Sequence, residues 1–128
     1  MTGATIEILP KTRFEHSSGS LTFKASTPQA IDTSGFNFLS LQVWVYNLQT
    51  GDTLKLSLEE ATVNEDDAYV PALSAAAPLL TFAGTGSTQT KIVHLIDFSR
   101  FIRLTVQPIL ASGNVVDVRA HLNLKLTP

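Results

Sequence analysis

Apolar and polar residues alternate along most of the chain, and a period of two is typical of strands with one buried face. In the clearest run, residues 116–126, six apolar side chains alternate with five polar ones. Shorter runs with the same period occupy residues 21–24, 54–59 and 102–107, and turn-forming residues separate them. Roughly eight or nine short strands at this spacing indicate a sandwich or barrel. We predict an all-β fold, a two-sheet antiparallel β-sandwich that is jelly-roll-like.

The segment from Phe36 to Leu48 differs from these runs because it is apolar on both sides. Its large apolar side chains form two sets, Leu39, Leu41, Val43 and Val45 on one side and Phe36, Phe38, Trp44 and Tyr46 on the other. A strand of this kind is either central in a sandwich or covered by a second molecule. We favour the central position, and we expect a partner to bind on its outer aromatic face.

Short polar segments set the connections between the predicted strands. Asn47–Asp52 and Ala111–Asn114 are predicted to be hairpin loops between adjacent strands. Only residues 73–80 could be helical, and Ala75–Pro78 favours a covering loop with about one helical turn. No internal repeat or linker is present, and we therefore predict a single β-sandwich domain over residues 16–128.

Residues 1–15 are predicted to form an N-terminal arm or edge strand. Ile6, Ile8 and Phe14 are apolar, but Pro10 lacks the backbone N–H that a sheet ladder needs. Such a segment either crosses onto a neighbouring subunit or packs on its own sheet. The predicted interface residues are therefore Ile6, Ile8 and Phe14, together with Trp44 and Tyr46 on the doubly apolar segment.

The surface is poor in charge. Charged residues make up 16% of the chain, against about 25% in an average soluble domain, and Thr, Ser, Asn and Gln replace them. Such a surface loses water at little cost, which suits packing against other proteins. A weakly charged secreted β-protein would have the same composition. The net charge of −2 is spread along the chain, so we expect no nucleic-acid partner. We also expect no membrane partner, signal peptide or membrane span.

The residues offer little for catalysis. Cysteine is absent, and none of His16, His94 and His121 has a serine or carboxylate at a spacing typical of a triad. Gly84 and Gly86 lack the third glycine and the lysine of a phosphate-binding loop, so they indicate a turn. We predict that the protein is not an enzyme and that it has no catalytic, cofactor-binding or metal-binding residues.

Two features keep a ligand-binding function open. Acidic residues gather between Glu59 and Asp67, and clustered carboxylates on a loop can bind calcium. The simpler interpretation is a solvated loop. Trp44, Tyr46 and Tyr69 could form a platform for a sugar, although core packing is favoured for Trp44.

Several segments together resemble small β-sandwich proteins encoded among the structural genes of tailed phages. The resemblance covers about residues 28 to 126. The segments that carry it are Ile31–Phe36 leading into Leu39–Val43, the acidic loop Glu65–Tyr69, the strand Phe98–Leu104 and the alternating strand that ends at Leu126. The resemblance implies a virion component, namely a capsid decoration (cement) protein or a related head or tail accessory subunit. Ser99–Leu104 also resembles one strand of discoidin-type jelly rolls, but the paired cysteines of that family are absent.

The first hypothesis is therefore a structural virion protein that packs on a major capsid protein or another virion protein and forms a homo-oligomer. Its expected location is the virion. The alternative is a carbohydrate- or ligand-binding β-sandwich module, which could depend on calcium.

Overall fold

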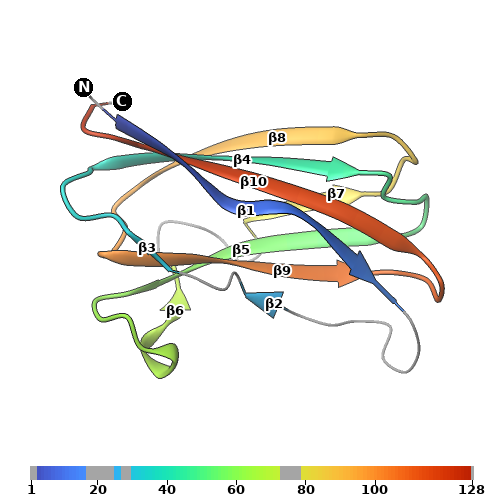
Figure 1. The fold of residues 1–128 in the computed structure, drawn as a ribbon, viewed down its shortest axis with the longest axis horizontal. Helices are drawn as coiled ribbons and strands as arrows, with labels where there is room; N and C mark the ends of the chain where they lie inside the picture. Colours follow the sequence, from blue (N-terminus) through green and yellow to red (C-terminus); the bar gives the residue numbers. More distant parts are fainter. Residues whose placement is uncertain (1–2, 17–24, 27–29, 73–78, 128) are drawn as a thin grey trace.

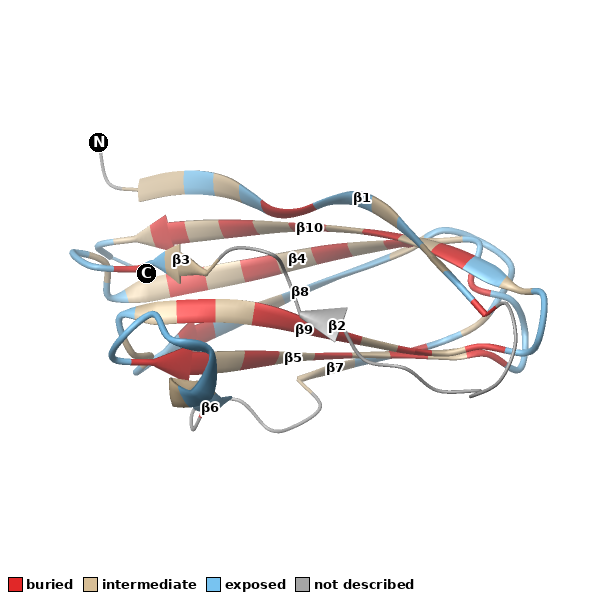
Figure 2. Cartoon of the chain, turned by 60° about the horizontal axis from the view of Figure 1, so that its bottom comes forward, coloured by how far each residue is buried: buried red, intermediate tan, exposed pale blue. Residues whose placement is uncertain are grey.

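A computed structural model describes residues 3–16, 25–26, 30–72 and 79–127. Figures 1 and 2 show two sheets stacked face to face. Sheet A has the order β1 (Gly3–Glu15), β10 (Val115–Lys125), β4 (Phe38–Tyr46), β8 (Gln89–Ile96). The centre of sheet B is β9 (Phe101–Ile109) paired with β5 (Thr53–Ala61). The pairings between the described strands are antiparallel, which confirms the predicted two-sheet, jelly-roll-like sandwich.

Short strands complete sheet B on both sides of its central pair. β2 (Ala25–Ser26) and β3 (Ile31–Asp32) pair with β9, whereas β6 (Val70–Pro71) and β7 (Leu80–Ala83) pair with β5. A short 3-10 turn, η1 (Asp66–Ala68), precedes β6. The predicted strand at residues 21–24 and the predicted covering loop at residues 73–78 lie outside the described residues, and Leu80 begins β7.

The core lies between the sheets, where the alternating apolar residues meet. Figure 2 shows buried and half-buried residues alternating along β4, β5, β9 and β10. Eleven of the twelve predicted inward residues of the three clearest runs are buried: Leu54, Leu56, Leu58, Ile102, Leu104, Val106, Val116, Val118, Ala120, Leu122 and Leu124. Leu126, the last residue of the alternating run, follows the end of β10 and is 43% exposed. The period of two therefore identified the core face of β5, β9 and β10 correctly.

The doubly apolar segment forms a strand inside sheet A. β4 pairs with β10 on one side and with β8 on the other, which is the predicted central position. Its inward residues are buried, and its outward residues Phe38, Trp44 and Tyr46 are half-buried on the outer face. Phe36 precedes the strand and packs against the core instead of standing in this outer row.

The two predicted hairpins are wrong. Asn47–Asp52 leads from β4 in sheet A to β5 in sheet B, and Ala111–Asn114 leads from β9 in sheet B back to β10 in sheet A. Both loops therefore cross the end of the sandwich. Leu48 and Leu110 are buried within or beside these loops, so the crossing extends the apolar core at this end.

Asp52 fastens this end of the sandwich. The residue is 5% exposed. One carboxylate oxygen accepts the backbone N–H of Ala111 at 3.0 Å, and the other accepts the side-chain amide of Asn114 at 2.9 Å. The Asp52 carbonyl accepts the N–H of Gly84 at 2.9 Å. One residue thus joins the crossing loops β4–β5 and β9–β10 to the β7–β8 loop.

The N-terminal residues belong to the sandwich. β1 follows β10 along its length as the outermost strand of sheet A, with register shifts between Glu7 and Thr12 where Pro10 lies. Ile8 is 5% exposed, and Ile6 and Phe14 pack against the core. The sequence left two possibilities for these residues, an arm or an edge strand. Residues 3–15 form one strand at the edge of their own sheet, so the second possibility is the correct one. The division of the chain at residue 15 stays a prediction.

Candidate interaction surface

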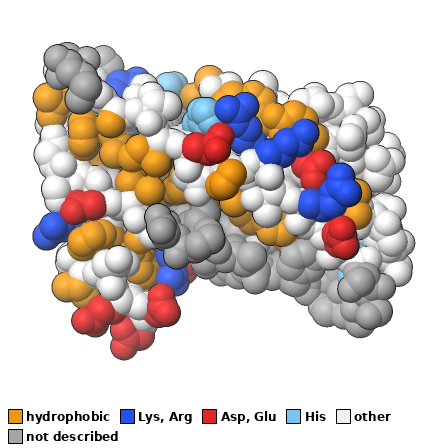
Figure 3. Space-filling view, in the orientation of Figure 1, with side chains coloured by type: hydrophobic (Ala, Val, Ile, Leu, Met, Phe, Trp, Pro, Cys, Tyr) orange, Lys and Arg blue, Asp and Glu red, His pale blue; other side chains and the backbone are white. Residues whose placement is uncertain are grey.

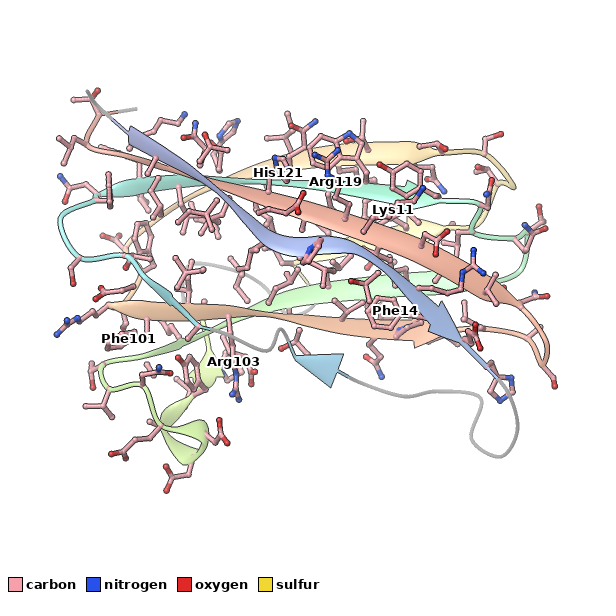
Figure 4. The ribbon with its side chains drawn as sticks, viewed as in Figure 1. Lys11, Phe14, Phe101, Arg103, Arg119 and His121 are labelled. Carbon is pink, nitrogen blue, oxygen red and sulfur yellow. The ribbon has the colours of Figure 1, made fainter. Side chains whose placement is uncertain are left out.

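The outer face of sheet A carries two contrasting halves, which the strand register defines. Residues paired across neighbouring strands point to the same face, so β1 and β10 bring together Glu7, His121 and Arg119, and β4 adds Trp44. Figure 4 shows Lys11, Arg119 and His121 projecting from this region, and Figure 3 shows the charged side chains adjoining one another there. We call Glu7, Lys11, Trp44, Tyr46, Arg119 and His121 the charged half.

Glu7 is the centre of the charged half. Its Oε2 atom lies 3.0 Å from His121 Nε2 and 3.1 Å from Arg119 Nε, and both nitrogens donate when protonated. These hydrogen bonds, that of His121 first, hold the pKa of Glu7 below its ordinary value. The bond to Glu7 also raises the pKa of Arg119. Glu7 and Arg119 therefore neutralise each other on the surface.

The aromatic rings of this half already have cationic partners from their own chain. The Arg119 guanidinium lies 4.9 Å from the ring centroid of Trp44, and His121 meets Trp44 edge-on at 5.1 Å. The Lys11 ammonium lies 4.4 Å from the centroid of the Tyr46 ring. A sugar stacking on these rings would compete with these cation–π contacts. The arrangement favours a structural role for both aromatic residues.

A Glu7→Gln variant is expected to flatten the dependence of stability on pH. The pKa of Glu7 is depressed in the folded state, so at acid pH the unfolded chain binds more protons than the folded one. This contribution is fully present above the pKa of an unfolded glutamate, about 4.3, and is lost as the pH falls through the folded value. Urea unfolding of both proteins between pH 7 and pH 3 should show a smaller loss for the variant. Parallel curves would contradict the expectation.

The other half of the outer face is apolar and lies along β8. Phe38, Ser40, Ile92, His94 and Ile96 form this surface, which we call the β8 face. Ile92 and Ile96 are 56% and 53% exposed, and Ser40 Oγ lies 2.7 Å from His94 Nδ1.

Two shallow depressions adjoin at the end of the β8 face. One has a volume of about 500 Å³ and includes Phe38, Ser40, His94, Ile96 and Lys125 in its lining. The second, of about 360 Å³, shares Phe38 and Ile96 with the first and extends toward the β8–β9 turn. The β8 face thus combines exposed apolar side chains with a hollow beside them.

β8 is also an open edge of sheet A. It pairs with β4 on one side, and no strand among the described residues pairs with its other side. The opposite edge, β1, is disrupted by Pro10 and two register shifts, which are features that prevent further strand pairing. β8 contains no proline, and its pairing with β4 is regular over eight residues. The two edges of this sheet therefore differ in their capacity to take a further strand.

The acidic loop is tied to sheet B. Arg103 on β9 bonds Glu59 at 3.0 Å and Asp66 at 3.5 Å, and its guanidinium lies 4.1 Å from the Tyr69 ring centroid. The Tyr69 hydroxyl donates to Asn64 Oδ1 at 2.9 Å. Among the described residues no group of three or more His, Cys, Asp or Glu side chains could hold a metal ion. Two of the residues that suggested calcium binding, Glu59 and Asp66, instead form ion pairs with Arg103.

The structure separates the predicted interface residues into two groups. Ile6, Ile8 and Phe14 pack in their own core, so they are not free for a neighbouring subunit while β1 stays paired. Trp44 and Tyr46 do lie on the outer face of sheet A. Their role at an interface stays a prediction.

Ile92 and Ile96 are the surface residues that sequence analysis missed. They stand in the run Ile92–Ile96, which is apolar on both faces like β4, and this was the available signal.

The three histidines occupy different settings. His94 bonds Ser40, His121 bonds Glu7, and His16 is buried at 5% exposure.

Comparison with known proteins identifies a fold but no family. No family model matches the sequence, and no curated protein matches it. TmCBM61, solved in complex with β-1,4-galactotriose, has a TM-score of 0.58 and 11% identity, covering 97% of this chain and 82% of its own. A chain from the structure of the Gx strain of infectious bursal disease virus is also similar, with a TM-score of 0.58 and 12% identity. The match covers 97% of this chain and 32% of the viral chain. VP2 of the subviral particle of that virus has a TM-score of 0.51 and 13% identity, again with 97% and 32% covered.

No helix in the described part of the chain is long and apolar enough to span a membrane. At identities this low, the structural likeness concerns the fold alone. The chain has the two-sheet β-sandwich of jelly-roll type that is found both in a carbohydrate-binding module and in a protein of a virus particle.

Proposed function

We propose that this protein is a structural subunit of an assembly and acts by packing against other protein through the β8 face, without catalysis. One observation carries the proposal: a strand edge that no described strand pairs with adjoins two isoleucines that are each more than half exposed. Exposed apolar groups beside an open edge are typical of interaction sites. The low charge of the chain, 16%, lowers the cost of removing water from such a surface.

The proposed setting is a virion, with a major capsid protein or another virion protein as the partner and several copies of the chain in contact. The resemblance of residues 28 to 126 to accessory proteins of tailed phages supports it. The shared fold with the infectious bursal disease virus chains supports an assembly role, although this chain spans only 32% of them.

Light scattering over a wide protein concentration range tests the proposal. We expect the mass of the wild-type protein to rise above that of one chain, 13.8 kDa, and to fall back to it in an Ile92→Lys, Ile96→Lys double variant. The two lysines add charge to a surface that must lose water on association. Because both side chains are exposed, we expect the variant to stay folded, as circular dichroism would check.

A matched control changes two equally exposed apolar residues elsewhere. Val63 and Val70 are 48% and 53% exposed on and beside the acidic loop. A Val63→Lys, Val70→Lys variant should associate like the wild type. A wild-type protein that stays monomeric at every concentration would contradict self-association and would give the ligand-binding alternative equal standing.

A carbohydrate- or ligand-binding module is the second candidate. The larger depression favours it, because Ser40, His94 and Lys125 supply polar groups beside apolar Phe38 and Ile96. Trp44 is the single tryptophan of the chain, so its fluorescence reports on the same outer face. Saturable quenching by a galacto-oligosaccharide, with or without calcium, would support this candidate; silence with all sugars tried would count against it.

A further inference from the structure

We infer that the occupant of the β8 edge is the β8 strand of a second copy of this chain, paired antiparallel about a two-fold axis. Sheet A of each copy would then continue into the other, and the two four-stranded sheets would form one sheet. This inference rests on the proposed function, because it names the partner that the β8 face binds. The choice of partner follows from the sequence of β8 itself.

The two-fold axis fixes which residues can meet. In an antiparallel pair with both outer faces on the same side, residue i of one copy lies opposite a residue of equal parity in the other. Each possible register is therefore centred on one residue, which lies on the two-fold axis opposite the same residue of the second copy. Each register can be judged by the side chains that it places face to face.

One register is complementary in its apolar pairs on both faces of the strand. When His94 lies opposite His94 of the second copy, Ile92 comes opposite Ile96 on the outer face, and the same pair recurs on the other side of the axis. On the inner face Val93 meets Leu95. Opposed apolar pairs stabilise antiparallel strands.

The neighbouring registers lack this match. With Val93 at the axis, Lys91 would lie opposite Leu95 and each isoleucine would meet a threonine or histidine. With Ile92 at the axis, the isoleucines meet at one point, and Ile96 lies opposite Thr88 beyond the start of β8. The His94-centred register is therefore the one that we assign.

Lys91 does not obstruct this pairing. A lysine pointing inward on an edge strand is one means by which proteins prevent edge pairing. Here its ammonium donates to the Thr81 carbonyl at 2.7 Å and lies 4.8 Å from the Phe82 ring centroid, so β7 of the same chain holds it. The backbone edge of β8 beside it stays uncovered by any described strand.

Single cysteines test the register directly, because the natural chain contains no cysteine. Residues directly opposite one another have Cβ atoms about 4.5–5.5 Å apart, close enough for a disulfide after a small adjustment. Only the residue on the two-fold axis lies opposite the same residue of the second copy. We therefore expect His94→Cys to form covalent dimers under mild oxidation, several-fold more than Ile92→Cys alone. A mixture of Ile92→Cys with Ile96→Cys should form the mixed dimer.

A Thr5→Cys variant is the matched control, since Thr5 is exposed on the outer face of the other edge strand, β1. Covalent dimers of Ile92→Cys in excess of His94→Cys would overturn the assigned register. Wild-type protein that associates in light scattering, while no β8 cysteine cross-links beyond the Thr5→Cys level, would overturn β8 pairing and leave the proposed function standing. A strictly monomeric wild type would overturn β8 pairing and would contradict the self-association that the proposed function expects.

Discussion

Replacement of Asp52 by alanine is expected to destabilise the protein by about 3 kcal/mol. The residue is 5% exposed, and its carboxylate accepts two hydrogen bonds, from the Ala111 N–H at 3.0 Å and from the Asn114 amide at 2.9 Å. A hydrogen bond to a charged group contributes about 1.5–3 kcal/mol, and the donors lose their partner in the variant. Water reaching the loop end would offset part of the loss. Urea unfolding measures the effect as a lower midpoint at an unchanged slope.

Two further variants separate the contributions at Asp52. Asp52→Asn keeps the size and one carbonyl oxygen, which can still accept from Ala111, but its amide then faces the amide of Asn114. We expect it to lose less stability than Asp52→Ala. Asn114→Ala removes one donor only, and its effect should not add to that of Asp52→Ala, because both remove the same hydrogen bond. Fully additive losses would show that the two side chains act independently.

Replacement of Gly84 by alanine is expected to cost about 3 kcal/mol or more, because a Cβ atom there would collide with the Gln49 carbonyl. The same Cβ would also lie 3.0 Å from the Leu48 carbonyl. That carbonyl accepts the N–H groups of Thr85 and Gly86 at 3.0 and 2.8 Å. The β4–β5 and β7–β8 loops must therefore separate to admit the methyl group, and these backbone hydrogen bonds would weaken. The midpoint of urea unfolding reports the loss.

Gly86 provides the control for this prediction. It lies in the same loop with a φ of +78°, and a Cβ there meets nothing within 4 Å. Gly86→Ala should therefore cost only the strain of a left-handed residue, about 1–2 kcal/mol. An equal cost at both positions would show that the close contact with Gln49 is not what requires glycine at residue 84.

The candidate surface shows where sequence reasoning reached its limit. Ile6, Ile8 and Phe14 were predicted at an interface, because an apolar run broken by Pro10 fits an arm as well as an edge strand. Ten cross-strand pairs between β1 and β10 place these residues on their own core instead. Ile92 and Ile96 were missed for the converse reason. Apolar residues on both faces of residues 92–96 are compatible with burial. The even-numbered residues, however, point to the outer face and are exposed there, and no strand among the described residues pairs with the second side of β8.

The loops show the same limit. Asn47–Asp52 and Ala111–Asn114 carry turn-forming residues, and these correctly mark where β4 and β9 end. Turn chemistry is local, however, and a loop of this length can close a hairpin or cross between sheets. The crossing is decided by the long-range contacts of each strand, since β4 joins β10 and β8 while β5 joins β9. Asp52 then links the two loops, which lie about 60 residues apart in the chain.

The sequence by itself determined the all-β class and the inward face of the clear strands, such as the alternating residues of β10. These properties follow from the two-residue period of an extended backbone, which any strand has before it meets a neighbour. The tertiary structure alone decided the strand order, the crossing loops and the open β8 edge. Those features depend on which distant segments pair and bury one another, and the free energy of such contacts is summed over the whole sandwich and not within any one segment.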